Sequence, residues 1–121
     1  MHRVYIAGTG FTRVGDHWSK SLLDLSTEAA KEALTDSKNQ KPELVVVGNM
    51  FSSISSSQEH IGPLVSNSIG LDGIPAFKVE SACASGASEL NVAYTYVKSG
   101  AVSCALVVGV EKMRDLEPFE V

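Results

Sequence analysis

A single cysteine lies in a run of small residues, where a strand pattern changes into a helix pattern. Cys83 follows the apolar alternation of residues 76–79 and precedes a helical pattern over residues 84–98. The unsatisfied amides and the positive dipole end of a helix N-terminus favour a thiolate over a thiol, and the thiolate is the nucleophilic form. Cys83 is therefore a candidate nucleophile. The alternative is a buried structural cysteine, since free cysteines are often buried and no general base is adjacent in the sequence.

The other residues that could do chemistry carry weaker signals. His60 falls in the first turn of a predicted helix, where the dipole disfavours a protonated imidazole, and we interpret it, like His17 and His2, as a surface histidine. Cys104 lies inside an apolar run and is predicted to be a core residue. The two cysteines form no CxxC pair and the histidines are not at metal spacing, so no metal site is predicted.

Strand and helix patterns alternate along the chain. The sequence predicts strands at residues 4–7, 44–47, 76–79 and 104–108, separated by helices at residues 21–34, 57–69 and 84–98. This order is typical of an α/β fold with a largely parallel sheet covered by helices. Ligands of such sheets bind beyond the carboxyl ends of the strands, and Cys83 directly follows one such end.

Three local predictions accompany these elements. Ser56 and Glu59 have the spacing of a capping box for the second helix. The last helix is predicted to present one apolar face, made of Leu90, Ala93, Tyr94 and Val97. The Gly-x-Gly of residues 8–10 invites a dinucleotide-binding interpretation, which we reject because Arg13 stands where the third glycine belongs.

Composition bounds the class of protein. The chain has 121 residues, enough for one domain with a core, and a net charge of −4 with no basic cluster. Nucleic-acid binding is therefore not expected, because its affinity rests on lysine and arginine neutralising phosphates. No apolar leader and no stretch of membrane-span length is evident, so we expect a cytoplasmic protein without a membrane span.

Two motifs together resemble the N-terminal half of thiolases. They are Glu80-Ser81-Ala82-Cys83-Ala84-Ser85-Gly86 and, about twenty residues later, Val107-Val108-Gly109-Val110-Glu111-Lys112-Met113. The stretch Gly48-Asn49-Met50-Phe51 is similar to the sterol-carrier-protein-type and archaeal acetyl-CoA acetyltransferase branch. The resemblance extends from Ile6 to Met113, nearly the whole chain.

The resemblance implies a site, a substrate and partners. Cys83 would be the acyl-accepting nucleophile of a thiolase N-terminal domain spanning residues 1–121, with a coenzyme A thioester as substrate and no permanently bound cofactor. Its backbone N–H would be one oxyanion donor. The family's second half, with its activating His and second Cys, and its coenzyme A-gripping loop domain have no counterpart here, so this chain alone is expected to be inactive. The family also implies a homodimer that pairs through the strand at residues 76–80.

Two alternatives remain open at the level of sequence. A 3-oxoacyl synthase of the same superfamily also places a cysteine at this turn, although the residues 109–113 favour a thiolase. The other alternative is a non-catalytic fragment or scaffold in which the cysteine is incidental. Acyl chain length, direction of the reaction and the identity of the general base are not determined by the sequence.

Overall fold

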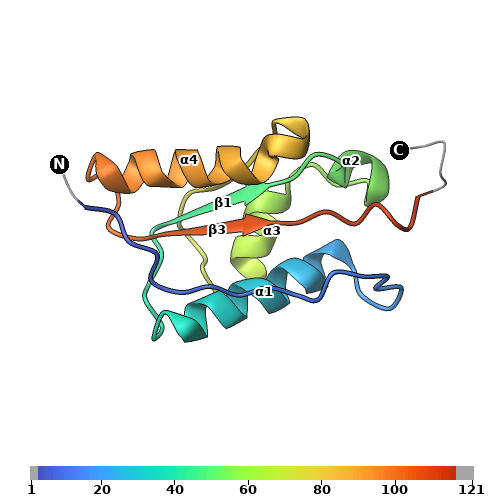
Figure 1. Ribbon diagram of the computed structural model, residues 1–121, viewed down its shortest axis with the longest axis horizontal. Helices are drawn as coiled ribbons and strands as arrows, with labels where there is room; N and C mark the ends of the chain where they lie inside the picture. Colours follow the sequence, from blue (N-terminus) through green and yellow to red (C-terminus); the bar gives the residue numbers. More distant parts are fainter. Residues whose placement is uncertain (1–2, 117–121) are drawn as a thin grey trace.

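A three-stranded parallel sheet forms the centre of the chain (Figure 1). The computed structural model describes residues 3–116. The sheet has the order β2-β1-β3, with β1 at Leu44–Gly48, β2 at Ala76–Val79 and β3 at Ala105–Gly109. Val46 of β1 is the register partner of both Phe77 and Val107. All of β1 is buried, which explains its continuous apolar sequence, and the predicted parallel α/β class is confirmed.

Helices cover both faces of this sheet (Figure 1). α1 (Leu22–Asp36) and α3 (Ile61–Ser68) lie on one face, and α4 (Ser85–Lys98) lies on the other. The short helix α2 (Ser52–Ser55) follows β1, and the 3-10 turn η1 (Ala82–Ala84) precedes α4. No helix within residues 3–116 combines the length and apolarity needed to cross a membrane.

The core consists of two clusters, one on each face of β1. Val45 and Val47 pack with side chains from α1 and α3, including Val65. Leu44 and Val46 pack on the α4 side, where Ala93 is buried with them. Successive strand residues point to opposite faces, so a single buried strand contributes to both clusters.

The ends of α1 agree with the sequence pattern. The Ser21 side chain accepts a hydrogen bond from the Asp24 amide at 3.0 Å, and the Asp24 carboxylate accepts one from the Ser21 amide at 2.8 Å. This reciprocal capping box begins the helix. Lys38 and Asn39 have φ angles of 57° and 60°, and this left-handed backbone ends it.

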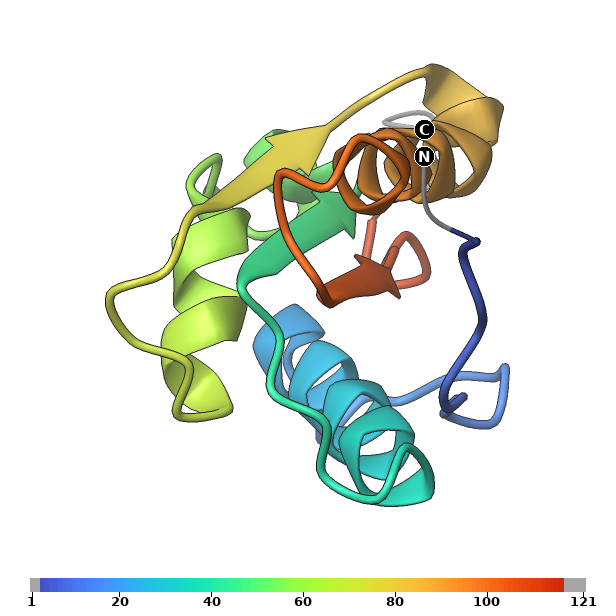
Figure 2. The same cartoon turned by 90° about the vertical axis from the view of Figure 1, so that its left-hand side faces the viewer.

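The predicted strand at residues 4–7 is wrong. Figure 2 shows that this segment, in dark blue, passes the sheet without joining it. Tyr5 and Ile6 are 75% and 78% exposed. The residues that follow the segment contact α1: the Thr9 amide donates to the Asp36 carboxylate at 2.8 Å. A Cβ at Gly8 would lie 2.5 Å from the Ala33 carbonyl oxygen. An apolar run becomes a strand only where another strand supplies ladder partners, and none in the described residues does so.

The capping box predicted for the second helix is also wrong. Ser56 is the C-cap of α2, and Ser57 then adopts a φ of 50°. α3 begins only at Ile61, with His60 at the N-cap and no side-chain cap. Glu59 binds Lys78 of β2 at 2.7 Å instead of capping a helix. The Glu59 side chain therefore forms an ion pair with a residue far along the chain and does not form the predicted capping box.

The predicted apolar face of α4 is only half right. Ala93 is buried and Val97 is half-buried, but Leu90 and Tyr94 are 52% and 47% exposed. The inward positions one and two turns before Ala93 are occupied by the polar residues Glu89 and Ser85, both 6% exposed. The first half of α4 therefore meets the sheet through polar groups.

We expect the close approach of α3 to β2 to require glycine at position 62. A Cβ at Gly62 would lie 2.6 Å from the Phe77 Cα, so Gly62→Ala should destabilise the chain by about 2 kcal/mol. Gly86→Ala in α4 is the matched control, since nothing lies within 4 Å of a Cβ there, and it should be neutral or stabilise by up to about 1 kcal/mol. Urea denaturation of both variants measures the difference. Equal stabilities would contradict the packing of α3 on β2.

Candidate functional site

The three parallel strands end on the same side of the sheet, and the loops that carry the sequence motifs begin at these carboxyl ends (Figure 1). β1 ends at Gly48, β2 at Val79 and β3 at Gly109. The Asn49 amide donates to the Val79 carbonyl at 3.2 Å, and the Val110 amide donates to the Gly48 carbonyl at 3.1 Å. The motifs that are separated in the sequence are therefore adjacent in the fold.

Cys83 lies exposed in the 3-10 turn between β2 and α4. Ala82 just before it has a φ of 51°, a left-handed conformation that is unfavourable for a residue with a Cβ. The strand-to-helix turn predicted for Cys83 is confirmed, with the 3-10 turn inserted between the two elements. α4 begins at Ser85, and its N-cap Ala84 supplies no side-chain hydrogen bond to the first-turn amides. The positive end of the α4 dipole is thus close to Cys83.

Ser85 braces this turn. Its hydroxyl accepts a hydrogen bond from the Ser81 amide at 2.9 Å and donates one to the Ala82 carbonyl at 2.7 Å. The Ala84 amide donates to the Ser81 carbonyl at 2.9 Å, which closes the turn across the cysteine. These three bonds compensate for the unfavourable Ala82 backbone and hold Cys83 in one orientation relative to α4.

Glu89 is a residue of this region that the sequence interpretation missed. Oε2 of its carboxyl group accepts a hydrogen bond from the Gly48 amide at 2.6 Å. Burial raises the pKa of Glu89 to about 7, against the hydrogen bonds from the backbones of Gly48 and Val108. The only signal in the sequence was a charged residue four positions after Ser85 and four before Ala93, on what becomes the inward face of the helix.

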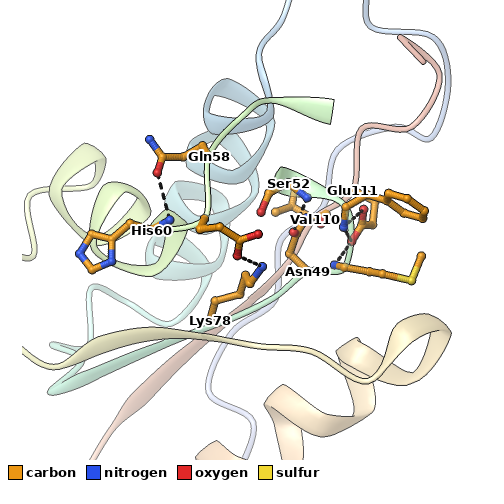
Figure 3. A network of polar contacts seen from close by, with 10 residues as sticks. Asn49, Ser52, Gln58, His60, Lys78, Val110 and Glu111 are labelled. Carbon is orange, nitrogen blue, oxygen red and sulfur yellow. Dashed lines mark hydrogen bonds and ion pairs between the residues drawn. The ribbon is translucent and has the colours of Figure 1, made fainter. Parts of the chain in front are cut away.

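The residues of the other two motifs form a polar network around the loop after β1 (Figure 3). The Asn49 side chain donates to the Val110 carbonyl at 2.8 Å and accepts from the Ser52 amide at 2.8 Å. The Glu111 carboxylate accepts from the Met50 amide, and from the Phe51 amide at 3.3 Å. These contacts give Asn49 and Glu111 a structural role, which is to tie the loop after β1 to the segment after β3.

The structure brings no base to Cys83. Within residues 3–116, no hydrogen bond joins Cys83 to an imidazole or a carboxylate. His60 is exposed, and Figure 3 shows its ring pointing away from Asn49 and Glu111. His17 contacts the Arg13 carbonyl at 2.5 Å, and His2 lies outside the described residues. No group of three or more potential metal ligands occurs in the described part of the chain.

Cys104 differs from the predicted core residue in its position and exposure. It lies one residue before β3 and is half-buried. Burial, with a second contribution from the Glu43 carboxylate, raises the pKa of the Cys104 thiol. Its backbone carbonyl accepts from the Glu43 amide at 2.9 Å. Its partial burial and its raised pKa make the Cys104 thiol a poorer nucleophile than an exposed thiol.

A hollow of about 570 Å³ lies away from this edge of the sheet. It is lined by residues of the N-terminal segment and α1: Thr9, Lys31, Glu32, Thr35 and Asp36. None of them belongs to the loops that follow the strands. A hollow of this kind, formed by exposed polar residues, has little in common with an apolar ligand pocket, and we assign it no chemistry.

Comparisons with known proteins show which family the chain resembles. A family model described as "Thiolase, N-terminal domain" matches residues 4–118. The chain is 40% identical over 118 residues to an acetyl-CoA acetyltransferase of Methanocaldococcus jannaschii, which covers 96% of this chain and 30% of the relative. It is 32% identical over 118 residues to human sterol carrier protein 2, covering 93% of this chain and 21% of that protein. The chain thus spans about a third or less of the length of these curated relatives.

Solved structures give the same fold. The 3-oxoacyl-[acyl-carrier-protein] synthase III of Aquifex aeolicus superposes with a TM-score of 0.70 at 26% identity, over 89% of this chain and 35% of that one. AbyA1, a tetronic acid condensing enzyme, superposes with a TM-score of 0.65 at 27% identity, over 75% of this chain and 30% of that one. The sheet with its covering helices is similar to part of the fold of condensing enzymes.

We expect the two thiols to react at different rates with iodoacetamide. Cys83 is exposed, whereas Cys104 is half-buried with a raised pKa, so at pH 8 Cys83 should be alkylated about tenfold faster. Peptide mapping by mass spectrometry measures both rates in one sample. Cys83→Ser and Cys104→Ser variants assign the two signals, and circular dichroism verifies that the chain is folded. Equal or reversed rates would contradict the exposures described above.

Proposed function

Because this chain belongs to the thiolase family, we propose that it carries the nucleophilic half of an acyltransferase acting on coenzyme A thioesters, with Cys83 as the residue that accepts the acyl group. The observation that supports this proposal most directly is the exposed position of Cys83 in a braced turn at the N-terminal end of α4. The acetyl-CoA acetyltransferases among its relatives favour acetyl-CoA or acetoacetyl-CoA as the thioester.

The proposed chemistry has two steps. The Cys83 thiolate attacks the thioester carbonyl carbon, the bond to the coenzyme A sulfur breaks, and the thiolate of coenzyme A leaves and takes up a proton. The carbanion of a second acyl-CoA then attacks the acyl carbon of the acyl-enzyme, the bond to the Cys83 sulfur breaks, and 3-oxoacyl-CoA and the Cys83 thiolate are released. In the reverse direction the Cys83 thiolate attacks the 3-oxo carbon of a 3-oxoacyl-CoA, acyl-CoA leaves as its carbanion and takes up a proton, and the thiol of coenzyme A then takes the acyl group from Cys83. A covalent intermediate divides one difficult transfer into two easier ones.

The rest of the machinery must come from outside residues 3–116. No base is hydrogen-bonded to Cys83 in the described residues, and the chain spans about 30% of its archaeal relatives. General-base and oxyanion contributions account for much of the catalysis of acyl transfer. We therefore propose that the chain by itself does not turn over, and that a C-terminal half completes the site.

A second candidate function is that of a 3-oxoacyl synthase-like condensing enzyme. It is favoured by the superposition on a 3-oxoacyl-[acyl-carrier-protein] synthase III with a TM-score of 0.70. The two candidates differ in the acyl donor, which is a coenzyme A thioester for one and an acyl carrier protein thioester for the other. A third candidate, a non-catalytic scaffold, requires no acylation of Cys83.

A chimera tests this proposal. Residues 4–118 of this chain replace the matching segment of the Methanocaldococcus jannaschii acetyltransferase, so that the relative supplies the remaining two thirds. With radiolabelled acetyl-CoA we expect one acetyl group on Cys83, found by peptide mapping. Cys83→Ser should lose the label, while the matched variant Cys104→Ser should keep it.

The unmodified archaeal enzyme is the positive control, and gel filtration and circular dichroism verify that the chimera is folded. Label that persists in Cys83→Ser, or a folded chimera that stays unlabelled while the parent is labelled, would overturn the assignment of Cys83. Label from an acyl carrier protein thioester but not from acetyl-CoA would favour the synthase.

We further propose that the chain associates as a homodimer through β2. β2 is an edge strand of the sheet, and an unpaired edge is a template for pairing with a second strand. The Val45 amide donates to the Pro75 carbonyl and the Asn49 amide to the Val79 carbonyl. Because strand peptide groups alternate in direction, those of Ala76 and Lys78 face outward, where a second copy would pair with them.

Lys78→Pro should weaken this dimer, because it removes an outward-facing N–H and leaves the bonds to β1 intact. Lys78→Thr is the matched control: it also loses the ion pair with Glu59 but keeps the N–H. Multi-angle light scattering over a micromolar concentration series measures the association. A wild-type chain that remains monomeric would refute the dimer. Equal effects of the two variants would place the contact elsewhere.

A further inference from the structure

A buried carboxyl group connects α4 to the ends of two strands. A Cβ at Gly48 would lie 2.9 Å from Glu89 Oε2, and a Cβ at Gly109 would lie 2.9 Å from Glu89 Oε1. The carboxyl group therefore spans the carboxyl ends of β1 and β3, and glycine at both positions leaves the space for it. Its hydrogen bond from the Gly48 amide and its 6% exposure make it part of the interior.

The same strand end contacts the residue that braces the cysteine turn. Ser85 lies one helical turn before Glu89 on the inward face of α4. A Cβ at Gly48 would lie 2.8 Å from the Ser85 carbonyl oxygen, so Gly48 fits between Ser85 and Glu89. The Ser85 hydroxyl in turn binds the backbone N–H of Ser81 and the backbone carbonyl of Ala82, the residue before Cys83. A chain of direct contacts thus leads from Glu89 to the cysteine turn.

We propose that Glu89 is a positioning residue for Cys83, which seats the first turn of α4 on the ends of β1 and β3 while its carboxyl group is protonated and releases it on ionisation. This inference rests on the proposed role of Cys83 as the nucleophile. Ionisation of Glu89 would leave a buried negative charge one helical turn from Ser85, the residue that binds the cysteine turn. That charge loosens the seat of α4 and disfavours negative charge on the Cys83 sulfur, so both effects reduce the reactivity of Cys83.

No cation of the elements that pack on α4 is free to balance this charge, and Lys112, in the described segment after β3, is paired with Asp115. The elements that pack on α4 are β1, β2, β3 and η1, and among them only β2 carries a charged residue. That residue, Lys78, is paired with Glu59. Glu80, whose carboxylate accepts from the Ala82 amide, adds a negative charge on the outer side of the turn. On α4 itself Lys98 lies in the last turn, far along the helix from Glu89.

The titration of Glu89 falls in the range where the site would work. Burial raises its pKa from the ordinary 4.5 to about 7. Since the folded state holds this proton more tightly than the unfolded chain, the contribution of Glu89 to stability is complete below pH 4.5 and is lost as the pH rises through about 7. The packing of α4 on the ends of β1 and β3 is therefore more stable in weak acid than above neutral pH.

The test compares Cys83 alkylation in the full 121-residue chain and in its Glu89→Gln variant, both carrying Cys104→Ser. Glutamine keeps the shape of the side chain and is neutral at every pH. The ratio of the two iodoacetamide rates removes the pH dependence that both chains share. We expect a ratio near one below about pH 6, rising to about threefold in favour of Glu89→Gln at about pH 8.5. Glu32→Gln, the same change at an exposed position of α1, should give a ratio near one throughout.

A Glu89→Gln ratio that stays constant with pH would overturn the proposal, even if urea denaturation showed that the variant changes stability. If Glu89→Gln does not fold, the wild-type profile is compared with that of the chain unfolded in urea. A second inflection near pH 7 in the folded chain supports the proposal, and its absence refutes it. Alkylation requires no thioester, so this outcome is independent of the chimera experiment that tests whether Cys83 accepts an acyl group.

Discussion

The burial of β1 on both faces and along both edges is the constraint on which the rest of the structure depends. Its four apolar residues are fully buried, with alternate side chains in the two core clusters. Because β1 is paired in parallel with β2 and β3, all three strands must end at the same edge of the sheet. The loops that carry the motifs therefore meet there, whatever their separation in the sequence.

Gly48, the last residue of β1, is the point at which the central strand contacts the helix that follows Cys83. With no side chain, it allows both Ser85 and Glu89 of α4 to approach its backbone. The helix that begins after Cys83 is thereby seated on the central strand, and the turn that holds Cys83 is braced by Ser85. The burial of the Glu89 carboxyl group follows from this close contact.

The proposed function depends on this arrangement more than on any single side chain. Cys83 is presented by a turn with an unfavourable Ala82 backbone, compensated by hydrogen bonds within the turn. Asn49 and Glu111 bind the backbone of the neighbouring loops. Under the proposed function, this part of the chain would supply the nucleophile at the end of the sheet, and the rest of a protein of which it spans about 30% would supply the other groups.

The sequence by itself determined the elements whose signals are local: the buried run of β1, the helix that begins after Ser21, and the strand-to-helix turn at Cys83. Only the tertiary structure decided the features that need a partner from elsewhere in the chain. Residues 4–7 are apolar, but a strand requires a neighbour with matching hydrogen bonds, and the chain after them is bound to α1 through Thr9 and Asp36. Glu59 has the spacing of a cap, but Lys78 binds it. From the sequence alone Glu89 is expected to be a solvated helix residue, whereas in the fold the ends of β1 and β3 at Gly48 and Gly109 enclose it. Its burial depends on which strand ends the helix packs against, and the local sequence pattern carries no information about that.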